Sequence, residues 1–469
     1  MSLPRPKFRV RLVPLIIACA LFMENLDSTI IATALPKIAQ SLNEAPLHLS
    51  LAITAYLLSL AVFIPVSGWV ADRYGAKRVF RCAILVFTGG SILCGLSHSM
   101  PGLVLARTLQ GLGGAMMTPV GRLLLLRKTP KSELVAAMSW LTVPALLGPV
   151  LGPPLGGFIV TYVSWRWIFF INAPIGLLGF WLVTRYIDET APEATRPLDW
   201  RGWLLLGGGL ALLMSGFEQA GKHVIGGTAV AALIIAGAGL LAAYVAYGRE
   251  RPGAIVDLGL LRIPTFRASV GGGGIYRIGI GAFTLMMPLM LQLGFGFSPA
   301  ASGTTTFVVA IGAVAMKTTA ARIVRRFGFR HLLIGNALVG AAFLVGVATF
   351  SSATPRALML GWLLAYGYLR SLQFTCINAL AYADVPEHRM SQATSFASTA
   401  QQVALSLGVG VGSQLLSASV ALRGASAPAA IDFRHAFFAV AALGAVSALM
   451  FRRLAPNAGS AVSGYAAMP

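Results

Sequence analysis

The sequence predicts an all-helical integral membrane protein with fourteen membrane-spanning helices. Of its 469 residues, 57% are hydrophobic and only 11% are charged, whereas about a quarter of the residues in a soluble domain are charged. The chain contains fourteen mostly apolar runs, and a spanning helix needs about 20 such residues. Its Lys and Arg residues gather in alternate connections between these runs. These observations exclude a soluble globular protein.

The fourteen runs follow one another closely, so that no soluble domain of any size fits between them. They cover approximately residues 12–34, 49–70, 79–98, 101–125, 134–160, 167–186, 202–217, 224–246, 266–293, 300–318, 330–350, 355–378, 392–421 and 435–451. The basic N-terminus before the first run resembles the start of a signal peptide, but no small-residue cleavage pattern follows. We therefore expect the first run to be retained as a spanning helix.

The net charge of +21 could indicate either nucleic-acid binding or membrane topology. With the N-terminus placed in the cytoplasm, the predicted inner segments hold 24 of the 36 Lys and Arg residues, the outer loops hold 6, and 6 lie within or at the ends of runs. Short inner loops of membrane proteins carry this excess. We expect both termini in the cytoplasm and no nucleic-acid partner, because no basic patch is combined with aromatic stacking residues.

The sequence predicts no metal site, cofactor or catalytic centre. The four cysteines form no CxxC pair, and no His lies near them at ligand spacing. No GxxxxGK[ST] phosphate-binding loop is present either. We therefore expect a protein that is not an enzyme and that draws energy from an ion gradient rather than from a nucleotide.

One internal repeat suggests how the chain is divided. The segment DRYGAKR at 72–78 is echoed by RRFGFRH at 325–331, eight runs later. Parallel six-helix repeats are the plan of one large transporter class, so eight runs correspond to six plus two inserted ones. We predict a six-helix bundle over 1–186, a linker with two inserted helices over 187–263, a second six-helix bundle over 264–454 and a cytoplasmic tail over 455–469. We expect the inserted helices mainly to hold the halves together.

The first run holds the only acidic residues well inside any apolar run, Glu24 and Asp27. Three residues apart, they share one helix face. A charged carboxylate in a bilayer is costly and usually lines a pathway or a proton relay. Burial favours the neutral carboxyl and a nearby cation favours the charged form, so a carboxyl that alternates between these environments can load and release a proton. For Glu24, the alternative is a local partner of Asp27.

The fourth run contains RTLQGLGGA at 107–115. Arg107 stays charged at any useful pH, so it can tune a neighbouring acid or bind an anion. Alternatively, its long side chain reaches the interface, because it lies about six residues from the outer end of the run.

Two further segments are rich in glycine. The loop GWVADRYGAK at 68–77 permits a tight turn, and Asp72 in it can face the positive end of a helix or pair with a cation. The fifth run contains GPVLGPPLGG at 148–157. Glycines at every fourth position form a flat stripe for close helix packing, and prolines bend the helix.

Together with LDSTIIATALP at 26–36 and WRWIFFINAPIG at 165–176, these segments resemble signatures of the major facilitator superfamily. The resemblance covers nearly the whole chain. It is to the fourteen-helix drug:proton antiporters of the EmrB/QacA type, above all the MdtD-like multidrug exporters. Val70, Ala76 and Ala32 depart from the signatures, and Ala32 stands where the family pattern has Asn. The segment at 165–176 is interpreted as positioning only.

The resemblance implies alternating-access export of small amphipathic compounds across the bacterial inner membrane in exchange for protons. It also implies three groups of residues: proton coupling at Asp27, Glu24 and Arg107; a conformational latch at Gly68, Asp72, Arg73, Gly75 and Lys77; and a cavity seal with helix packing at Gly148, Pro149, Gly152, Pro153, Gly156 and Gly157. For the last group, a pure packing role is equally compatible with the sequence.

The C-terminal half offers candidates for the substrate cavity. Arg277 and Arg370 interrupt apolar runs that contain no acid, and Gln373 and Gln110 complete the set. For the two arginines, hydrogen bonds to carbonyls between helices are the alternative, and Lys317 is expected to reach the interface. With Arg107, three candidate cavity cations face two acids, which argues against a site specialised for cationic drugs.

Two other functions are compatible with the sequence. One is an exporter of an organic anion, a metabolite or a metal chelate on the same fold. The other is a membrane receptor or scaffold that transports nothing. The expected partners are a small-molecule substrate, protons and the lipid bilayer, and a monomer is compatible with the sequence.

Overall fold

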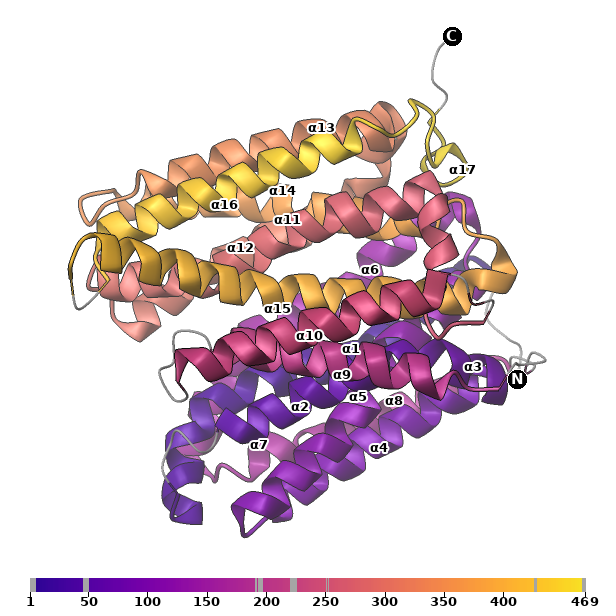
Figure 1. Cartoon of the computed structure of the whole chain (residues 1–469), viewed down its shortest axis with the longest axis horizontal. Helices are drawn as coiled ribbons and strands as arrows, with labels where there is room; N and C mark the ends of the chain where they lie inside the picture. The colour runs from indigo at the N-terminus through magenta and orange to yellow at the C-terminus, as the bar shows by residue number, and fades with distance from the viewer. Residues whose placement is uncertain are drawn as a thin grey trace.

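The computed structural model describes residues 6–44, 50–189, 192, 197–219, 226–249, 251, 253–425 and 428–465. Every regular element within these ranges is helical (Figure 1). The predicted all-helical fold is therefore confirmed.

The helices before the predicted insertion are α1 (Pro6–Leu42), α2 (Ser50–Phe63), η1 (Ile64–Val66), α3 (Ser67–Tyr74), α4 (Ala76–Leu96), α5 (Met100–Lys128), η2 (Lys131–Glu133), α6 (Leu134–Tyr162), α7 (Trp167–Phe170) and α8 (Asn172–Tyr186). The helices within the predicted insertion are α9 (Trp200–Gln219), α10 (Gly227–Arg249) and η3 (Leu258–Arg262). The helices after it are α11 (Pro264–Leu289), η4 (Met290–Gly294), α12 (Pro299–Ala315), η5 (Met316–Thr318), α13 (Ala320–Ala348), α14 (Arg356–Ala381), η6 (Glu387–Arg389), α15 (Met390–Leu422), α16 (Ala430–Phe451) and α17 (Ser460–Ser463).

Each of the fourteen predicted runs coincides with one helix or with helices that follow directly on one another. Within the described residues, nine of these segments are long and apolar enough to cross a membrane. The helix α5, whose apolar stretch contains Arg107 and Arg122, is not among them. Both arginines are buried against neighbouring helices.

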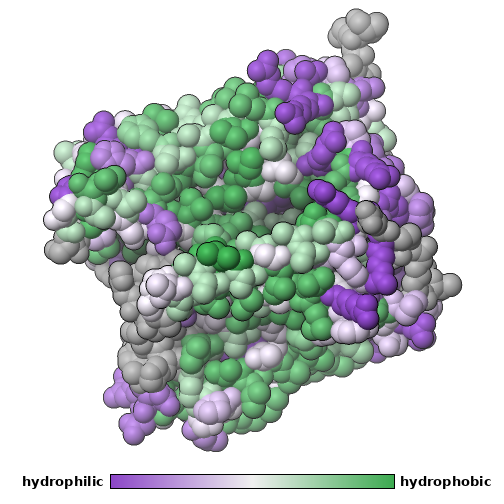
Figure 2. All heavy atoms as spheres, viewed as in Figure 1, coloured by the Kyte–Doolittle hydropathy of each residue, from purple (hydrophilic) through white to green (hydrophobic). Residues whose placement is uncertain are grey.

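The surface fits a lipid environment. Figure 2 shows apolar side chains across the middle of the visible face and hydrophilic ones towards the ends, most densely at the end where both chain ends are marked in Figure 1. Leu105 and Ile235 are each 71% exposed. Apolar groups exposed on this scale are stable in hydrocarbon but not in water.

The internal repeat has a common backbone geometry. Gly75 follows the eight-residue helix α3 with φ +87°, and Gly328 follows eight helical residues of α13 with φ +66°. Both values lie in the region that side chains disfavour. Both glycines therefore make a sharp turn between a short helix and the next long helix.

The helices before the predicted insertion pack mainly against one another, as do those after it. Within the predicted insertion, α9 packs against α10 and also contacts α2 and α15. Trp203 of α9 donates its indole N–H to the carbonyl of Val62 at 2.8 Å. The ring of Phe217, also on α9, lies against Gly410 of α15. The insertion thus contacts both sets of helices.

Hydrogen bonds also join the two sets directly. The Ser395 hydroxyl of α15 donates to the carbonyls of Ile64 and Pro65 at 2.9 and 2.8 Å. Lys131 donates its ammonium to the carbonyl of Ala383 at 3.0 Å. These residues all lie near the inner ends predicted from the charge distribution, so the two sets are held together at that end.

Candidate functional site

The carboxylate of Asp27 lies in the interior among the first eight helices, and the residue is 1% exposed. Its Oδ2 accepts from Arg107 Nη1 at 2.5 Å. Its Oδ1 accepts from Gln110 Nε2 at 2.8 Å and from Asn172 Nδ2 at 2.9 Å. An ion pair and two amide donors from α5 and α8 therefore compensate the charge of this carboxylate.

The guanidinium of Arg107 is equally enclosed, with a relative exposure of 0%. Nη1 also donates to Gln110 Oε1 at 2.8 Å, and Nε donates to the carbonyl of Ala52 at 3.4 Å. The group lies 4.3 Å from the ring centroid of Tyr56, a favourable cation–π contact. Arg107 thus turns inward to Asp27 rather than outward to the interface, which settles the alternative left open by the sequence.

Asn172 is the member of this network that the sequence analysis missed. Its Nδ2 donates both to Asp27 and to the hydroxyl of Ser91 at 2.9 Å, and Ser91 donates in turn to the carbonyl of Phe169 at 2.9 Å. The interpretation of the segment 165–176 as positioning only is therefore incomplete. An Asn inside an apolar run is a signal for such a contact, because a buried amide needs hydrogen-bond partners, and Asn172 is 0% exposed.

Glu24 lies one turn before Asp27 on α1 but belongs to a different contact. Its Oε2 accepts from the hydroxyl of Thr118 at 2.9 Å, and the residue is half-buried. No hydrogen bond or ion pair joins it to Asp27 or Arg107 in the described part of the chain. The structure therefore separates the two acids that the sequence had grouped.

The glycine stripe of α6 packs on α1 beside Asp27. A Cβ built on Gly148 would lie 2.7 Å from the backbone nitrogen of Leu26, and one built on Gly152 would collide with the hydroxyl of Thr29. Thr29 donates to the carbonyl of Gly148 at 3.3 Å. These glycines let the two backbones approach closely, so α6 fixes the segment of α1 that carries the carboxylate.

The other predicted seal residues differ from this pair. Gly156 is buried, but a Cβ on Gly157 would meet no described atom within 4 Å. Close packing at Gly157, as predicted, therefore has no support from the described residues. The side chains of Pro149 and Pro153 lie outside the described residues.

We expect Gly148→Ala to lower the free energy of unfolding by about 1–3 kcal/mol, because the new methyl group meets the backbone of α1 rather than a movable side chain. Thermal unfolding of the purified protein measures the effect. Gly157→Ala, with open space around it, is the matched control and should unfold like the wild type. Equal losses in both variants would mean that any extra methyl group on α6 is harmful.

Two of the predicted latch residues contact α15. Asp72 accepts from Arg127 Nη2 at 3.3 Å and from the hydroxyl of Ser391, in the first turn of α15. A Cβ on Gly68 would lie 2.7 Å from the carbonyl oxygen of Ser391. Asp72 therefore both pairs with a cation and faces a helix N-terminus, where a negative charge is favourable.

Two other latch residues, Gly75 and Lys77, act within the first set of helices. Gly75 forms the turn described above. Lys77 is 8% exposed and donates to the carbonyl of Thr184 at 3.2 Å, which ties α4 to α8. The side chain of Arg73 lies at the surface.

The candidate cavity residues fall into two groups. Arg277 is 4% exposed, with Nη2 donating to Asn378 Oδ1 at 2.8 Å, and Arg370 is half-buried 5.8 Å from the ring of Phe283. Gln373, by contrast, donates to a carbonyl of α13 at 3.0 Å and accepts from an Asn of the same helix at 2.9 Å. The polar atoms of Gln373 are used in packing, and those of Gln110 are used in the Asp27 network, which corrects their assignment to the cavity.

Lys317 is a further correction. Its expected position was at the interface, but it is 7% exposed and its ammonium donates to the hydroxyl of Thr375 at 2.9 Å. Lys317 belongs to η5, and its side chain is buried between helices rather than at the surface.

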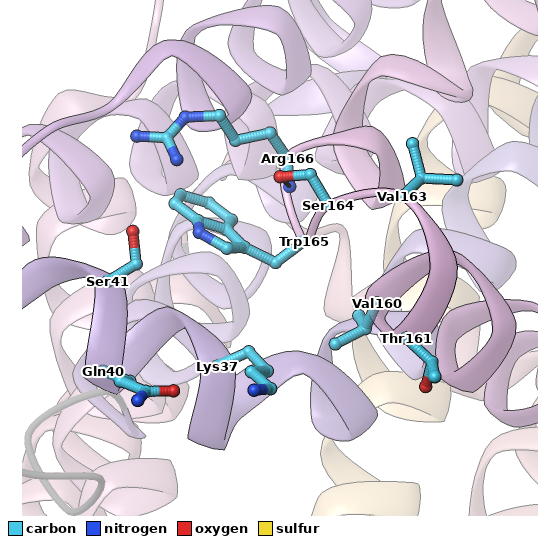
Figure 3. A pocket seen from close by; sticks show the side chains of 9 residues that line it. All are labelled: Lys37, Gln40, Ser41, Val160, Thr161, Val163, Ser164, Trp165 and Arg166. Carbon is cyan, nitrogen blue, oxygen red and sulfur yellow. Dashed lines mark hydrogen bonds between the residues drawn. The ribbon is translucent and has the colours of Figure 1, made fainter.

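A depression of about 520 Å³ lies at the opposite end from the latch, between the ends of α1 and α6 (Figure 3). Lys37 and Arg166 are in its wall, and the guanidinium of Arg166 lies 4.4 Å from the ring of Trp165. Lys37 is about 15 Å along α1 from Asp27, at 1.5 Å per residue. This depression is therefore separate from the carboxylate network.

Among the described residues, no group of His, Cys, Asp and Glu could hold a metal ion.

Comparison with known proteins agrees with these features. The model of the Major Facilitator Superfamily matches residues 17–409 and 270–466. The "Putative multidrug resistance protein MdtD" of Salmonella typhimurium is 40% identical over 412 residues, which cover 86% of this chain and 85% of that protein. Its counterpart in Salmonella heidelberg is 39% identical over the same shares.

Two solved structures have the same fold at low sequence identity. The human organic anion transporter MFSD10 superposes with a TM-score of 0.67 at 15% identity and covers 96% of this chain and 100% of its own. The proton:xylose symporter XylE superposes with a TM-score of 0.68 at 15% identity and covers 97% and 98%. At this identity the likeness concerns the fold alone.

Proposed function

This chain belongs to the major facilitator superfamily and is a multi-pass membrane transporter, and from that premise we propose that it exports small amphipathic compounds in exchange for protons. The proposal includes direction and coupling: the substrate moves outward across the bacterial cytoplasmic membrane while protons move inward. Both termini then lie in the cytoplasm, and a monomer carries out the cycle.

The ion pair of Asp27 and Arg107 is the observation that carries the proposal. An acid inside a membrane helix is costly, and this one lies in the candidate span Val13–Ile31. Protonation of Asp27 removes its negative charge and breaks the 2.5 Å ion pair. Arg107 cannot lose its own proton. Its remaining contacts are then the Tyr56 ring and neutral hydrogen-bond acceptors.

This change alters the packing of three helices at once. Asp27 is on α1, Arg107 and Gln110 are on α5, and Asn172 is on α8. A proton on Asp27 weakens the donors' hold on α1, and loss of that proton restores it. We propose that this is how proton binding biases the first bundle between its two orientations.

We propose that the moving units are residues 1–186 and 264–454, linked through 187–263. The latch of Asp72 and Gly68 against Ser391 supports an outward-facing state, because these contacts join the two units at their inner ends. In the alternate state the contacts at Asp72 and Ser395 separate, and the inner ends open to the cytoplasm.

A transport assay in proteoliposomes tests the function. The purified protein is reconstituted and an imposed pH gradient drives uptake of ethidium, a lipophilic cation, or of benzoate, an anion. We expect gradient-dependent accumulation of at least one probe, abolished by collapse of the gradient with an ionophore. Accumulation of neither probe, with the protein folded and correctly inserted, would favour the receptor or scaffold.

The anion exporter is kept as the second candidate because of two arginines in the C-terminal half. Arg277 and Arg370 form no ion pair with any described residue. Accumulation of benzoate without ethidium in the same assay would favour this candidate over an exporter of cationic drugs.

A further inference from the structure

Arg122, on α5, is a buried cation that the coupling network does not use. It is 5% exposed, and its Nη1 donates to the hydroxyls of Tyr382 at 3.3 Å and Ser398 at 3.4 Å. Its Nε has no hydrogen-bond partner among the described residues. Two long bonds to neutral oxygens compensate a buried guanidinium poorly.

Arg277, on α11 of the other half, is in the same situation. Its Nη2 donates to Asn378 Oδ1 at 2.8 Å and its Nη1 donates to the carbonyl of Ser269 at 3.3 Å. Its Nε, too, has no partner in the described part of the chain. Both acceptors are neutral.

The two arginines converge on the C-terminal end of α14. Asn378, which Arg277 contacts, lies in the last turn of α14, and Tyr382, which Arg122 contacts, follows that helix directly, four residues after Asn378. Residues at this spacing are neighbours on a helix surface, about 6 Å apart. The two guanidinium groups therefore approach the same place from the two halves of the protein.

No carboxylate among the described residues pairs with either arginine. Glu24, which accepts from Thr118 one turn away on α5, attracts Arg122 electrostatically but forms no ion pair with it. Two cations close together in the interior repel each other strongly because the dielectric constant is low. The same arrangement attracts an anion, and the planar fork of arginine matches carboxylate and phosphate oxygens.

We propose that Arg122 and Arg277 bind the anionic group of the transported compound, a carboxylate or a phosphate on a small amphipathic molecule. This proposal rests on the proposed transport function, because it names the substrate class of the same protein. Phe374, whose ring centroid lies 5.5 Å from the guanidinium of Arg277, provides an apolar surface beside the charge. An anion at this point contacts both halves, so its binding is linked to their relative movement.

Equilibrium binding to the purified full-length protein in detergent tests the proposal. The probes are benzoate, phenyl phosphate and benzyl alcohol, a neutral molecule of similar size, and intrinsic tryptophan fluorescence reports binding. We expect the two anions to bind at least about tenfold more tightly than the alcohol. One hydrogen bond to a charged group contributes more free energy than a tenfold change in affinity requires. Arg122→Gln and Arg277→Gln should each remove this preference and leave the affinity for benzyl alcohol unchanged.

Arg356→Gln is the matched control, because Arg356 is an exposed arginine on α14. It should keep the preference for anions. The Gln variants should also unfold at a higher temperature than the wild type without ligand, because a poorly compensated buried charge is removed. If a Gln variant fails to fold, the Lys variant at the same position is used instead. It retains the positive charge without the planar guanidinium, and it should lower the affinity for both anions.

Three results would overturn the proposal: equal affinity for anions and alcohol, Gln or Lys variants with wild-type preference, or no saturable binding of either anion. Repeating the titration with phosphatidylglycerol or phosphatidylcholine in the micelles separates a soluble anion from a lipid headgroup. Competition by phosphatidylglycerol alone would assign the arginines to lipid and overturn the substrate assignment. The binding experiment needs no gradient, so its result is independent of the transport assay. If anions bind but no coupled export is measured, the proposed function is contradicted and the anion site is retained.

Discussion

Asp27→Asn is expected to reduce accumulation driven by a pH gradient to the level of protein-free liposomes. Asparagine has nearly the shape of the carboxyl group but cannot take up or release a proton. Without that proton cycle, the imposed gradient has no means of biasing the orientation of the first bundle. Exchange of labelled for unlabelled substrate, which needs no proton movement, should continue at a measurable rate.

The fold should survive this substitution. The new amide nitrogen faces the donors Gln110 and Asn172, but Asn172 Oδ1 has no partner among the described residues of the wild type and can rotate to accept from it. Arg107 retains Gln110 Oε1, the Ala52 carbonyl and the Tyr56 ring. We expect a smaller loss than the about 3–5 kcal/mol that follows when a buried ion pair loses one partner outright, because the new amide oxygen still accepts from Arg107.

Glu24→Gln is the control that distinguishes the two acids of α1. Glu24 contacts Thr118 rather than the arginine, so its variant should retain gradient-driven accumulation. The measurement uses whichever of ethidium or benzoate the wild-type protein concentrates. Wild-type accumulation by Asp27→Asn, or its loss in Glu24→Gln alone, would move the coupling site to Glu24.

The positions of the helices could be predicted from the sequence because lipid imposes a simple rule. A chain that crosses hydrocarbon must satisfy its backbone within each segment, so each crossing is a long apolar helix. Breaks inside the runs were not predicted. One lies at η1, where Pro65 removes a backbone donor, and another at η4, just after Pro288. Both prolines were visible signals.

The acid and the cation of the site were also predictable, because each is costly in an apolar run. Their partners were not, since Asp27 meets Arg107 across 80 residues and Asn172 across 145. Such contacts depend on which helix faces pack together. Gln373 illustrates the same difficulty: its residue type fitted a cavity, but its position on α14 turns it towards α13.

Arg107→Met is expected to be the most destabilising of the single substitutions considered, and combining it with Asp27→Asn should restore part of the loss. The single variant leaves the Asp27 carboxylate buried with two amide donors only. Removing one partner of a buried ion pair costs about 3–5 kcal/mol, whereas replacing both partners is often nearly neutral. The double variant should therefore be more stable than Arg107→Met alone.

The double-mutant cycle is measured by thermal unfolding of the four proteins in the same detergent. Arg166→Met serves as the control, because Arg166 stacks on Trp165 at the opposite end from the latch and contacts no acid among the described residues. It should lose little stability and show no coupling with Asp27→Asn. Strictly additive losses for Arg107 and Asp27 would show that the 2.5 Å contact carries no interaction energy of its own. The proton switch would then lose its physical basis, since breaking a pair without energy cannot shift helices.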